Sequence, residues 1–182
     1  MERGYYLSMA IRRIIELGDP LLRQRSQPVV AYADAEPTLE DLRDTLHEFQ
    51  RTHGFGRGIA AIQIGVPQRV IYLEINGEAY ELINPVFESQ SEQKFRLWDD
   101  CFSFPNLMVL LERSVTVAIR YENRSGETKR LVAESSFAEL VQHEIDHLDG
   151  VLSIDRALDP RTSFMTRGEY LRRQAKQTLS DL

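Results

Sequence analysis

The spacing of apolar residues predicts an amphipathic helix in the first third of the chain. Its apolar positions, which recur every three to four residues and so share one face, are Leu39, Leu42, Leu46 and Phe49. Thr38, followed three residues later by Asp41, resembles a capping arrangement at the start of this helix, and Gly54 marks its end. We therefore expect one face of the helix to pack on a core.

A second helix, from Ser136 to Gly150, is predicted to be buried on several sides. Its apolar residues are Phe137, Leu140, Val141, Ile145 and Leu148. So wide an apolar surface is typical of a helix enclosed by other elements. A third helix, polar and partly exposed, is expected from Phe164 to Leu179.

Between these helices the pattern predicts two β-hairpins. Asn76-Gly77, the strongest short hairpin signal, lies between the first two β-rich runs, and Ser125-Gly126 supplies turn residues between the next two. The runs are residues 69–75 with 78–83, and residues 115–121 with 128–132. The fold class is therefore α+β, with antiparallel or mixed sheets wrapped around a central helix, plus an N-terminal and a C-terminal helix.

Length and charge narrow the classes of protein. The 182 residues, 42% of them hydrophobic, suit a single catalytic domain over residues 9–182, with residues 1–8 as an N-terminal extension. A net charge of −6 argues against a nucleic-acid surface, which requires clustered Lys and Arg. No apolar run approaches the roughly 18 residues of a membrane span, and no signal-peptide pattern is present. We expect a cytoplasmic location without a membrane partner.

The segment from His143 to His147 carries the chemistry of the predicted central helix. Two of the four histidines of the chain lie here, four residues apart, so a helix places both imidazoles on one face, where they can share a metal ion. Glu144 follows the first of them and can take a proton from a metal-activated water and return it to a leaving group. The alternative is an ordinary solvated helix that carries His and Glu by accident.

Catalytic metal sites use three protein ligands, so a third ligand is needed. No His or Cys follows His147, and Asp155 and Asp159 are more simply interpreted as loop acids or helix caps. Cys101 is the only cysteine, so it has no partner for a disulfide within the chain, and it lies in a loop before Pro105 from which a thiolate could face the helix. The alternative for a lone cysteine is a buried, inert thiol.

Three stretches together resemble the peptide deformylase family. Residues 56–63 resemble its Gly-x-Gly-aliphatic-Ala-Ala-x-Gln motif, residues 99–105 resemble Glu-Gly-Cys-Leu-Ser-x-Pro, and residues 142–150 match the third motif without a departure. The three occur in the order and approximate spacing of the family, and the resemblance extends from Ile11 to about Leu158. It implies sheets around a metal-bearing helix and a hydrolase that takes part in N-terminal processing during protein biosynthesis.

The resemblance also implies the substrate, the ion and the roles of residues. The substrate would be an N-formyl peptide, typically the formyl-methionine start of a new bacterial protein, met at the ribosome. The ion would be ferrous iron (Fe2+), with Zn2+, Ni2+ or Co2+ able to occupy the site. The residues implied are Cys101, His143 and His147 as ligands, Glu144 as general base and acid, and Gln63 with the backbone N–H of Phe102 as donors to the oxyanion.

The chain departs from the second motif at Asp99 and Asp100, where the family has Glu and Gly. The family Glu pairs with an arginine twelve residues beyond the cysteine, and we expect the shorter Asp99 to pair with Arg113 after a small shift. Asp100 is more awkward, because a glycine position can require backbone angles or space that a side chain denies. Met108 stands where some members carry a substrate-contacting arginine.

The expected substrate pocket combines a family feature with further departures. The family feature is Gly58, which is expected to let the backbone approach an extended peptide that pairs like an added strand. Arg57 replaces a common aliphatic residue, and Glu139 lies one turn before His143, where family members line an apolar pocket for methionine. We expect Arg57 and Glu139 to face each other and make the pocket narrower or more polar; the alternative is that Glu139 points away into solvent.

Three functions follow from these observations. The first is peptide deformylase activity on N-formylmethionyl peptides. The second is a deformylase-like amidohydrolase acting on another N-formyl or N-acyl compound, which rests on the changed pocket residues. The third is a metal-binding or peptide-binding homologue without turnover, which rests on Asp99, Asp100 and Met108.

Overall fold

The computed structural model describes residues 11–180, and side chains up to residue 177. The helices are α1 (Glu36–His53), α2 (Ser135–Leu148) and α3 (Arg167–Ser180). The strands are β1 (Gly58–Ala60), β2 (Val70–Ile75), β3 (Glu78–Gln90), β4 (Lys94–Asp100), β5 (Leu107–Ser114), β6 (Thr116–Glu122), β7 (Thr128–Glu134) and β8 (Phe164–Thr166). Short 3-10 helices cover Pro20–Arg23, Tyr32–Asp34, Ala61–Ile64 and Ser153–Arg156. The predicted N-terminal extension, residues 1–8, lies outside the described residues.

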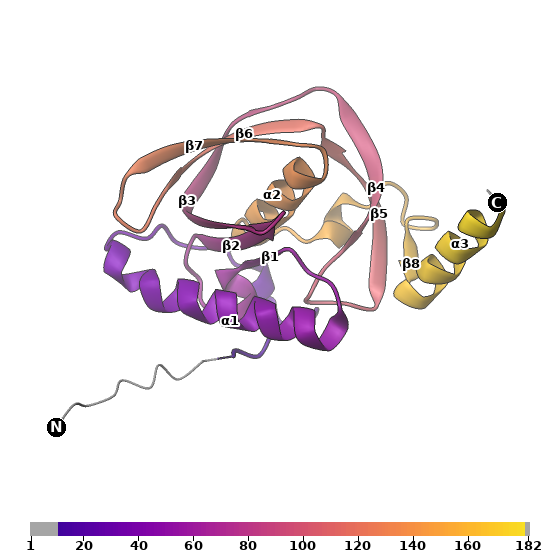
Figure 1. Cartoon of the computed structure of the whole chain (residues 1–182), viewed down its shortest axis with the longest axis horizontal. Coiled ribbons are helices and arrows are strands. Elements are labelled where there is room, and N and C mark those ends of the chain that lie inside the picture. Colours follow the sequence, from indigo (N-terminus) through magenta and orange to yellow (C-terminus); the bar gives the residue numbers. More distant parts are fainter. Residues whose placement is uncertain (1–10, 181–182) are drawn as a thin grey trace.

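Two antiparallel sheets curve around α2 (Figure 1). One has the strand order β1-β2-β3-β6-β7 and the other β4-β5-β8. The pairing of β3 with β6 shifts register between Ile83 and Val86 and again between Phe87 and Ser89. Such irregularities increase the bend and twist of a strand, which lets the long β3 curve over the helix. The expected α+β fold around a central helix is confirmed.

The Asn76-Gly77 hairpin forms as the sequence predicts. Ile75 pairs with Glu78, so the loop has two residues, and both have positive φ values, 52° and 81°. A two-residue turn of this kind matches the twist of the flanking strands. The second hairpin, β6–β7, is also present, and Gly126 in its loop has a φ of 78°.

Helix α2 is the most enclosed of the three α-helices in the described chain. Every residue from Ala138 to Leu148 is buried. Its apolar side packs against a core cluster whose other members include Ile62, Ile71, Leu73, Leu82, Val117 and Ile119. The polar residues of the His-Glu-x-x-His segment are therefore carried into the interior, where each needs a partner.

The predicted capping arrangement of α1 is wrong. The helix begins at Glu36, two residues before Thr38, with Pro37 in its first turn. Proline is well suited to that position, because the first helical N–H groups have no partner within the helix. The Thr38 hydroxyl donates to Gln68 Oε1 at 2.7 Å and so ties α1 to the loop before β2. The end of the helix at Gly54, in the left-handed region with a φ of 77°, is as expected.

Strands β4 and β5 are absent from the sequence-based prediction, and they hold Cys101 in the loop between them. All seven residues of β4 pair with β5 in one continuous register. The expected start of the terminal helix at Phe164 is also wrong, because Phe164 pairs with Val109 and Met165 with Met108 in β8. Helix α3 then begins at Arg167 and projects from the body (Figure 1).

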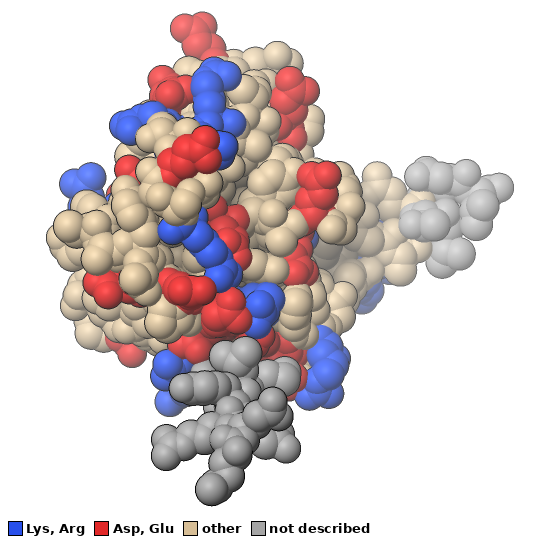
Figure 2. Space-filling model, turned by 60° about the vertical axis from the view of Figure 1, so that its left-hand side comes forward, with Lys and Arg blue, Asp and Glu red and all other residues tan. Residues whose placement is uncertain are grey.

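The surface carries charges of both signs. Figure 2 shows Lys and Arg interspersed with Asp and Glu over the face in view. Many of these groups are paired; Arg124, for example, contacts both Glu40 and Glu81. Within residues 11–180, no helix is both long and apolar enough to cross a membrane.

Candidate active site

Three potential metal ligands converge in the interior. Cys101 follows β4 directly, while His143 and His147 lie one turn apart on α2. Cys101 Sγ lies 3.2 Å from His147 Nε2, which lies 3.1 Å from His143 Nε2. The three donor atoms are within 4.8 Å of one another, and all three side chains are buried. The arrangement therefore brings together the residues that the sequence predicts as ligands.

The chemistry of this donor set fits a divalent ion. Bond lengths of about 2.0–2.3 Å to nitrogen and sulfur in a tetrahedral site place donor atoms roughly 3.3–3.6 Å apart, close to the separations found here. Burial, together with His143, lowers the pKa of His147 well below its ordinary value and favours the neutral imidazole that a metal requires. Burial also raises the pKa of the Cys101 thiol, a shift that a cation would reverse.

A buried chain of charges orients the first histidine. His143 Nδ1 lies 3.0 Å from Asp99, and Arg113 donates to the same carboxylate at 3.2 Å. Burial acts to lower the pKa of His143, but Asp99 outweighs it and raises this pKa well above the ordinary value. The contact favours a proton on Nδ1, so Nε2 is left to face His147 and the ligand cluster. The expected pair of Asp99 and Arg113 is present.

The charge chain continues from Arg113 to the surface. Arg113 contacts Asp146 of α2, which also accepts two hydrogen bonds from Arg156, both at 2.5 Å. Arg113 is almost fully buried, whereas the Arg156 side chain is 45% exposed. Arg113 thus neutralises two buried carboxylates, and Arg156, which lies at the surface, provides a second positive charge next to Asp146.

Glu144 lies beside the ligand cluster, and one of its buried oxygens has no hydrogen bond to the described residues. The residue is 3% exposed, and Oε2 has no hydrogen-bond partner among the described residues. Burial raises the pKa of Glu144 to about 7, where a carboxyl can both accept and release a proton. Gly58 makes room for it: a Cβ at Gly58 would lie 3.0 Å from Glu144 Oε1 and 2.6 Å from Leu73 Cδ2.

Gln63 is held with its amide N–H groups toward the cluster. Its Oε1 accepts a hydrogen bond from the Ala60 N–H at 2.9 Å, and its Nε2 lies 3.7 Å from Cys101 Sγ and 3.4 Å from Ser103 Oγ. Phe102, which follows Cys101, stacks on Phe49 of α1 with 3.8 Å between ring centroids. The helix therefore supports the loop that carries the cysteine.

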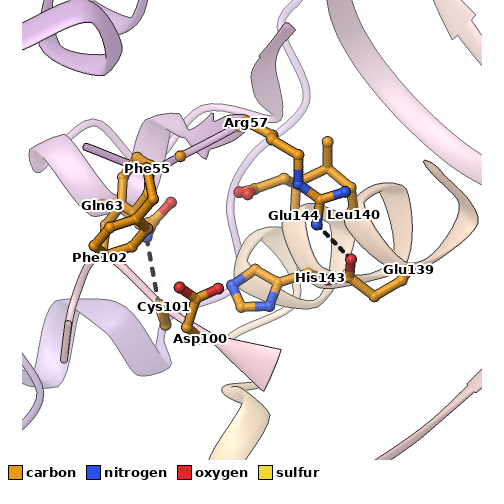
Figure 3. Close-up of a pocket in the computed structure, with 12 residues that line it drawn as sticks. Phe55, Arg57, Gln63, Asp100, Cys101, Phe102, Glu139, Leu140, His143 and Glu144 are labelled. Atoms are coloured by element: carbon orange, nitrogen blue, oxygen red, sulfur yellow. Dashed lines mark hydrogen bonds and ion pairs between the residues drawn. The ribbon is translucent and has the colours of Figure 1, made fainter. Parts of the chain in front are cut away.

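These groups open onto one pocket of about 360 Å³ (Figure 3). The lining comprises Phe55, Gly56, Arg57, Gly58, Gln63, Asp100, Cys101, Phe102, Glu139, Leu140, His143 and Glu144. It includes every residue that the sequence predicts for catalysis and substrate binding, and two of the three ligands; His147 is not part of the lining. The structure thus brings the predicted site residues together at one cavity.

Comparison with known proteins agrees with this geometry. The sequence profile described as Polypeptide deformylase matches residues 11–163. The chain belongs to this family. Peptide deformylases of Thermotoga petrophila and Bartonella tribocorum are 37% and 36% identical to it, over 87% and 81% of this chain and 94% and 84% of theirs.

Solved structures of peptide deformylases show the same fold. The enzyme of Thermotoga maritima matches with a TM-score of 0.77 and 33% identity, covering 82% of this chain and 99% of that one. The enzyme of Synechococcus elongatus, solved in complex with actinonin, matches with a TM-score of 0.77 and 30% identity, covering 85% and 82%. The resemblance stated from the three motifs is confirmed, and with it a metal-dependent hydrolase.

Two departures from the deformylase motifs have a structural account. Asp100 has no left-handed backbone, and its carboxylate contacts Arg167 at the start of α3. A glycine is therefore not required at that position. Met108 is 3% exposed and lies outside the lining of the pocket, paired with Met165 of β8. Neither departure removes a group from the ligand cluster.

The interpretation of Glu139 as a solvated residue is wrong. Its side chain is 7% exposed and faces Arg57, whose Nη2 donates to Glu139 Oε2 at 2.6 Å. Arg57 Nη1 also donates to the Ser136 carbonyl at 3.1 Å. The ion pair joins the strand side of this deformylase pocket to α2, as Figure 3 shows.

Arg167 contributes to the structure around the pocket, and the sequence analysis does not identify it. Its guanidinium lies over the Phe55 ring, 3.7 Å from the centroid, donates to the Pro105 carbonyl at 2.6 Å and contacts Asp100. It therefore joins the glycine-rich loop and the cysteine loop to α3. Neither periodicity nor a motif marks this residue, because its partners lie more than 60 positions away.

Proposed function

We propose that this chain releases formate from N-formyl peptides, including the N-formylmethionyl starts of nascent proteins, at the site built around Glu144. The observation that carries the proposal is a buried carboxylate with an unpartnered oxygen, placed beside three convergent metal ligands at the base of a pocket. A buried polar atom without a partner is costly, so a reacting group is the natural partner for this oxygen.

Cys101, His143 and His147 would hold one divalent ion. When bound, the ion supplies Lewis-acid chemistry, because it lowers the pKa of a water molecule to about 7 and polarises a carbonyl oxygen. Asp99 fixes the proton on His143 Nδ1, and Arg113 in turn holds Asp99. These contacts orient the ligand before any substrate arrives.

The other residues act on protons, charge and position. Glu144 takes the proton from the attacking water and delivers it to the leaving amine, a role for which a pKa of about 7 is suited. Gln63 Nε2 and the backbone N–H of Phe102 would donate to the oxyanion that develops on the formyl group. The substrate backbone would lie along Gly58, where a side chain is excluded. Arg57, Asp100 and Glu139 line the pocket beside it.

The ion and the place of action form part of the same proposal. We expect Fe2+ as the native ion, as the family membership implies. Imidazole and thiolate also accept Zn2+, Ni2+ or Co2+, so the supply of each metal contributes to which ion is bound. N-formyl groups of nascent chains are met in the cytoplasm at the ribosome, so we expect the chain to act there.

Replacing Glu144 tests the proposal. Metal-loaded Glu144→Ala should keep its ion but release formate about 10²–10⁴ times more slowly than the wild type, because the proton carrier is lost. The matched control is Glu92→Ala, which removes an exposed carboxylate outside the lining of the pocket and should leave the rate unchanged. Formate release from formyl-Met-Ala-Ser is measured beside the metal content of each protein.

Two outcomes would contradict this assignment. Undiminished formate release by metal-loaded Glu144→Ala would remove Glu144 from the mechanism. Absence of formate release by wild-type protein loaded separately with Fe2+, Zn2+, Ni2+ and Co2+ would reject the activity itself.

A further inference from the structure

The Arg57–Glu139 ion pair divides the candidate pocket in an unusual way for a site that receives an apolar side chain. Arg57 precedes β1, and Glu139 projects from α2, so the two come from opposite walls of the cavity. Their contact of 2.6 Å bridges those walls. Figure 3 shows the guanidinium extended across to the Glu139 carboxylate.

Glu139 depends on the ion pair more than Arg57 does, because the two side chains differ in solvent exposure. The Glu139 side chain is 7% exposed, whereas that of Arg57 is 42% exposed. Burial raises the pKa of Glu139, nearby Asp99 raises it further, and Arg57 opposes both effects. Arg57 can be solvated without its partner, but Glu139 without Arg57 is a buried carboxylate close to a second one.

A substrate side chain that displaced Arg57 would therefore leave Glu139 unpaired. Separating a pair of which one partner is buried is costly, since the remaining charge lacks both water and a counter-ion. The thioether of methionine offers no hydrogen-bond donor and only a weak acceptor, so it cannot compensate either group. A short side chain leaves the bridge intact, and a hydroxyl can hydrogen-bond to it.

We infer that the Arg57–Glu139 bridge sets the side-chain preference of this site, so that N-formyl peptides with a short polar first residue are used more efficiently than those with a long apolar one. This inference rests on the proposed deformylase function and specifies its substrate class. The bridge acts on the first side chain, while the ligand cluster and Glu144 act on the formyl group. Selectivity and chemistry are thereby separable.

The test compares formate release from formyl-Ser-Ala-Ser and formyl-Met-Ala-Ser. In wild-type enzyme we expect the higher kcat/KM for the serine peptide. In Arg57→Leu/Glu139→Leu, where both charges are removed together, the ratio of kcat/KM for methionine over serine should rise roughly tenfold or more, mainly through KM. The charge swap Arg57→Glu/Glu139→Arg keeps a bridge and should keep the wild-type ratio.

A matched control uses an ion pair outside the pocket. Arg130 and Glu88 form an exposed contact between β7 and β3 at 2.8 Å. Replacing both with leucine should leave the peptide ratio unchanged. The metal content and cooperative thermal unfolding of every variant are measured first. If the double pocket variant does not fold, Arg57→Leu/Glu139→Gln tests the same ratio, because it breaks the bridge and leaves no buried charge behind.

Binding gives a readout that does not depend on turnover. In a Glu144→Ala background, calorimetry of the uncleaved peptides should show the same shift in Kd between serine and methionine when the bridge is removed. An unchanged ratio in kinetics and in binding would overturn the inference while formate release continues. No formate from any peptide with wild-type protein would instead reject the proposed function.

Discussion

The two ends of α2 handle buried charge in different ways. Toward its C-terminus, Asp146 lies in a continuous chain with Arg113 and Asp99, and Arg113 is only 2% exposed at its side chain. Toward its N-terminus, Glu139 depends on Arg57, which is 42% exposed. At one end the central cation, Arg113, is buried, whereas at the other end the cation that pairs with Glu139 is partly exposed.

This difference suits the tasks of the two ends. Metal ligands must be held in fixed geometry, and a chain of mutually compensating charges around a buried arginine provides that rigidity. At the substrate pocket, the cost of separating a partly exposed arginine from a buried carboxylate can discriminate between the side chains that enter. The comparison predicts large losses from changes at the C-terminal end of the helix and smaller ones at its N-terminal end.

Removing a ligand should have the largest effect. Cys101→Ala leaves two imidazoles for the ion, so we expect the purified protein to lose its metal and formate release to fall to background. Ser26→Ala is the control, because it truncates another buried side chain whose hydroxyl has no partner. Metal analysis and the formate assay check both variants. Full metal content in Cys101→Ala would show that the thiolate is not a ligand.

Removing the buried cation should be the next largest effect. Arg113→Met leaves Asp99 and Asp146 buried with one partner fewer each, and such a loss costs about 3–5 kcal/mol of the free energy of unfolding. The control Arg156→Met should cost clearly less, since Asp146 keeps Arg113 and Arg156 is 45% exposed. Urea denaturation measures both. Equal losses would mean that burial does not distinguish the two arginines.

Weakening the contact with His143 should have a subtler effect. Asp99→Asn preserves the shape but removes the charge that orients the imidazole. We expect metal affinity to fall roughly 10–100-fold, measured by competition with a chromophoric chelator. Folding should be affected less than by Arg113→Met. An unchanged affinity would show that Asp99 does not act through the ligand.

Much of the fold could be predicted where local signals and tertiary structure agree. Asn76-Gly77 specifies its own turn, and the wide apolar surface of α2 indicates enclosure. Strand β5 is a short apolar run without alternation, so periodicity does not identify it, and β4 depends on β5 for its register. At Thr38, the local capping signal lost to Pro37 and to a hydrogen bond with distant Gln68.

In the candidate site, too, some residues carry a local sequence signal and others do not. The spacing of His143 and His147 identifies two ligands without any other information. Cys101 could be chosen only because few alternatives remained and because the surrounding motif resembled a family. Arg156 and Arg167 had no signal at all, since each acts through a tertiary contact. The contribution of these two arginines is therefore visible only in the fold.

The smallest expected effect is the loss of Arg57, and it tests the comparison most directly. Arg57→Met leaves Glu139 without its cation, but water can partly replace the exposed guanidinium. We therefore expect the free energy of unfolding to fall by about 1–2 kcal/mol, less than for Arg113→Met. Adding Glu139→Gln should recover part of this loss, because a neutral amide no longer requires a cation. Urea denaturation of both single variants and the double variant gives their coupling free energy. A loss for Arg57→Met as large as that for Arg113→Met would show that the two ends of α2 hold charge alike.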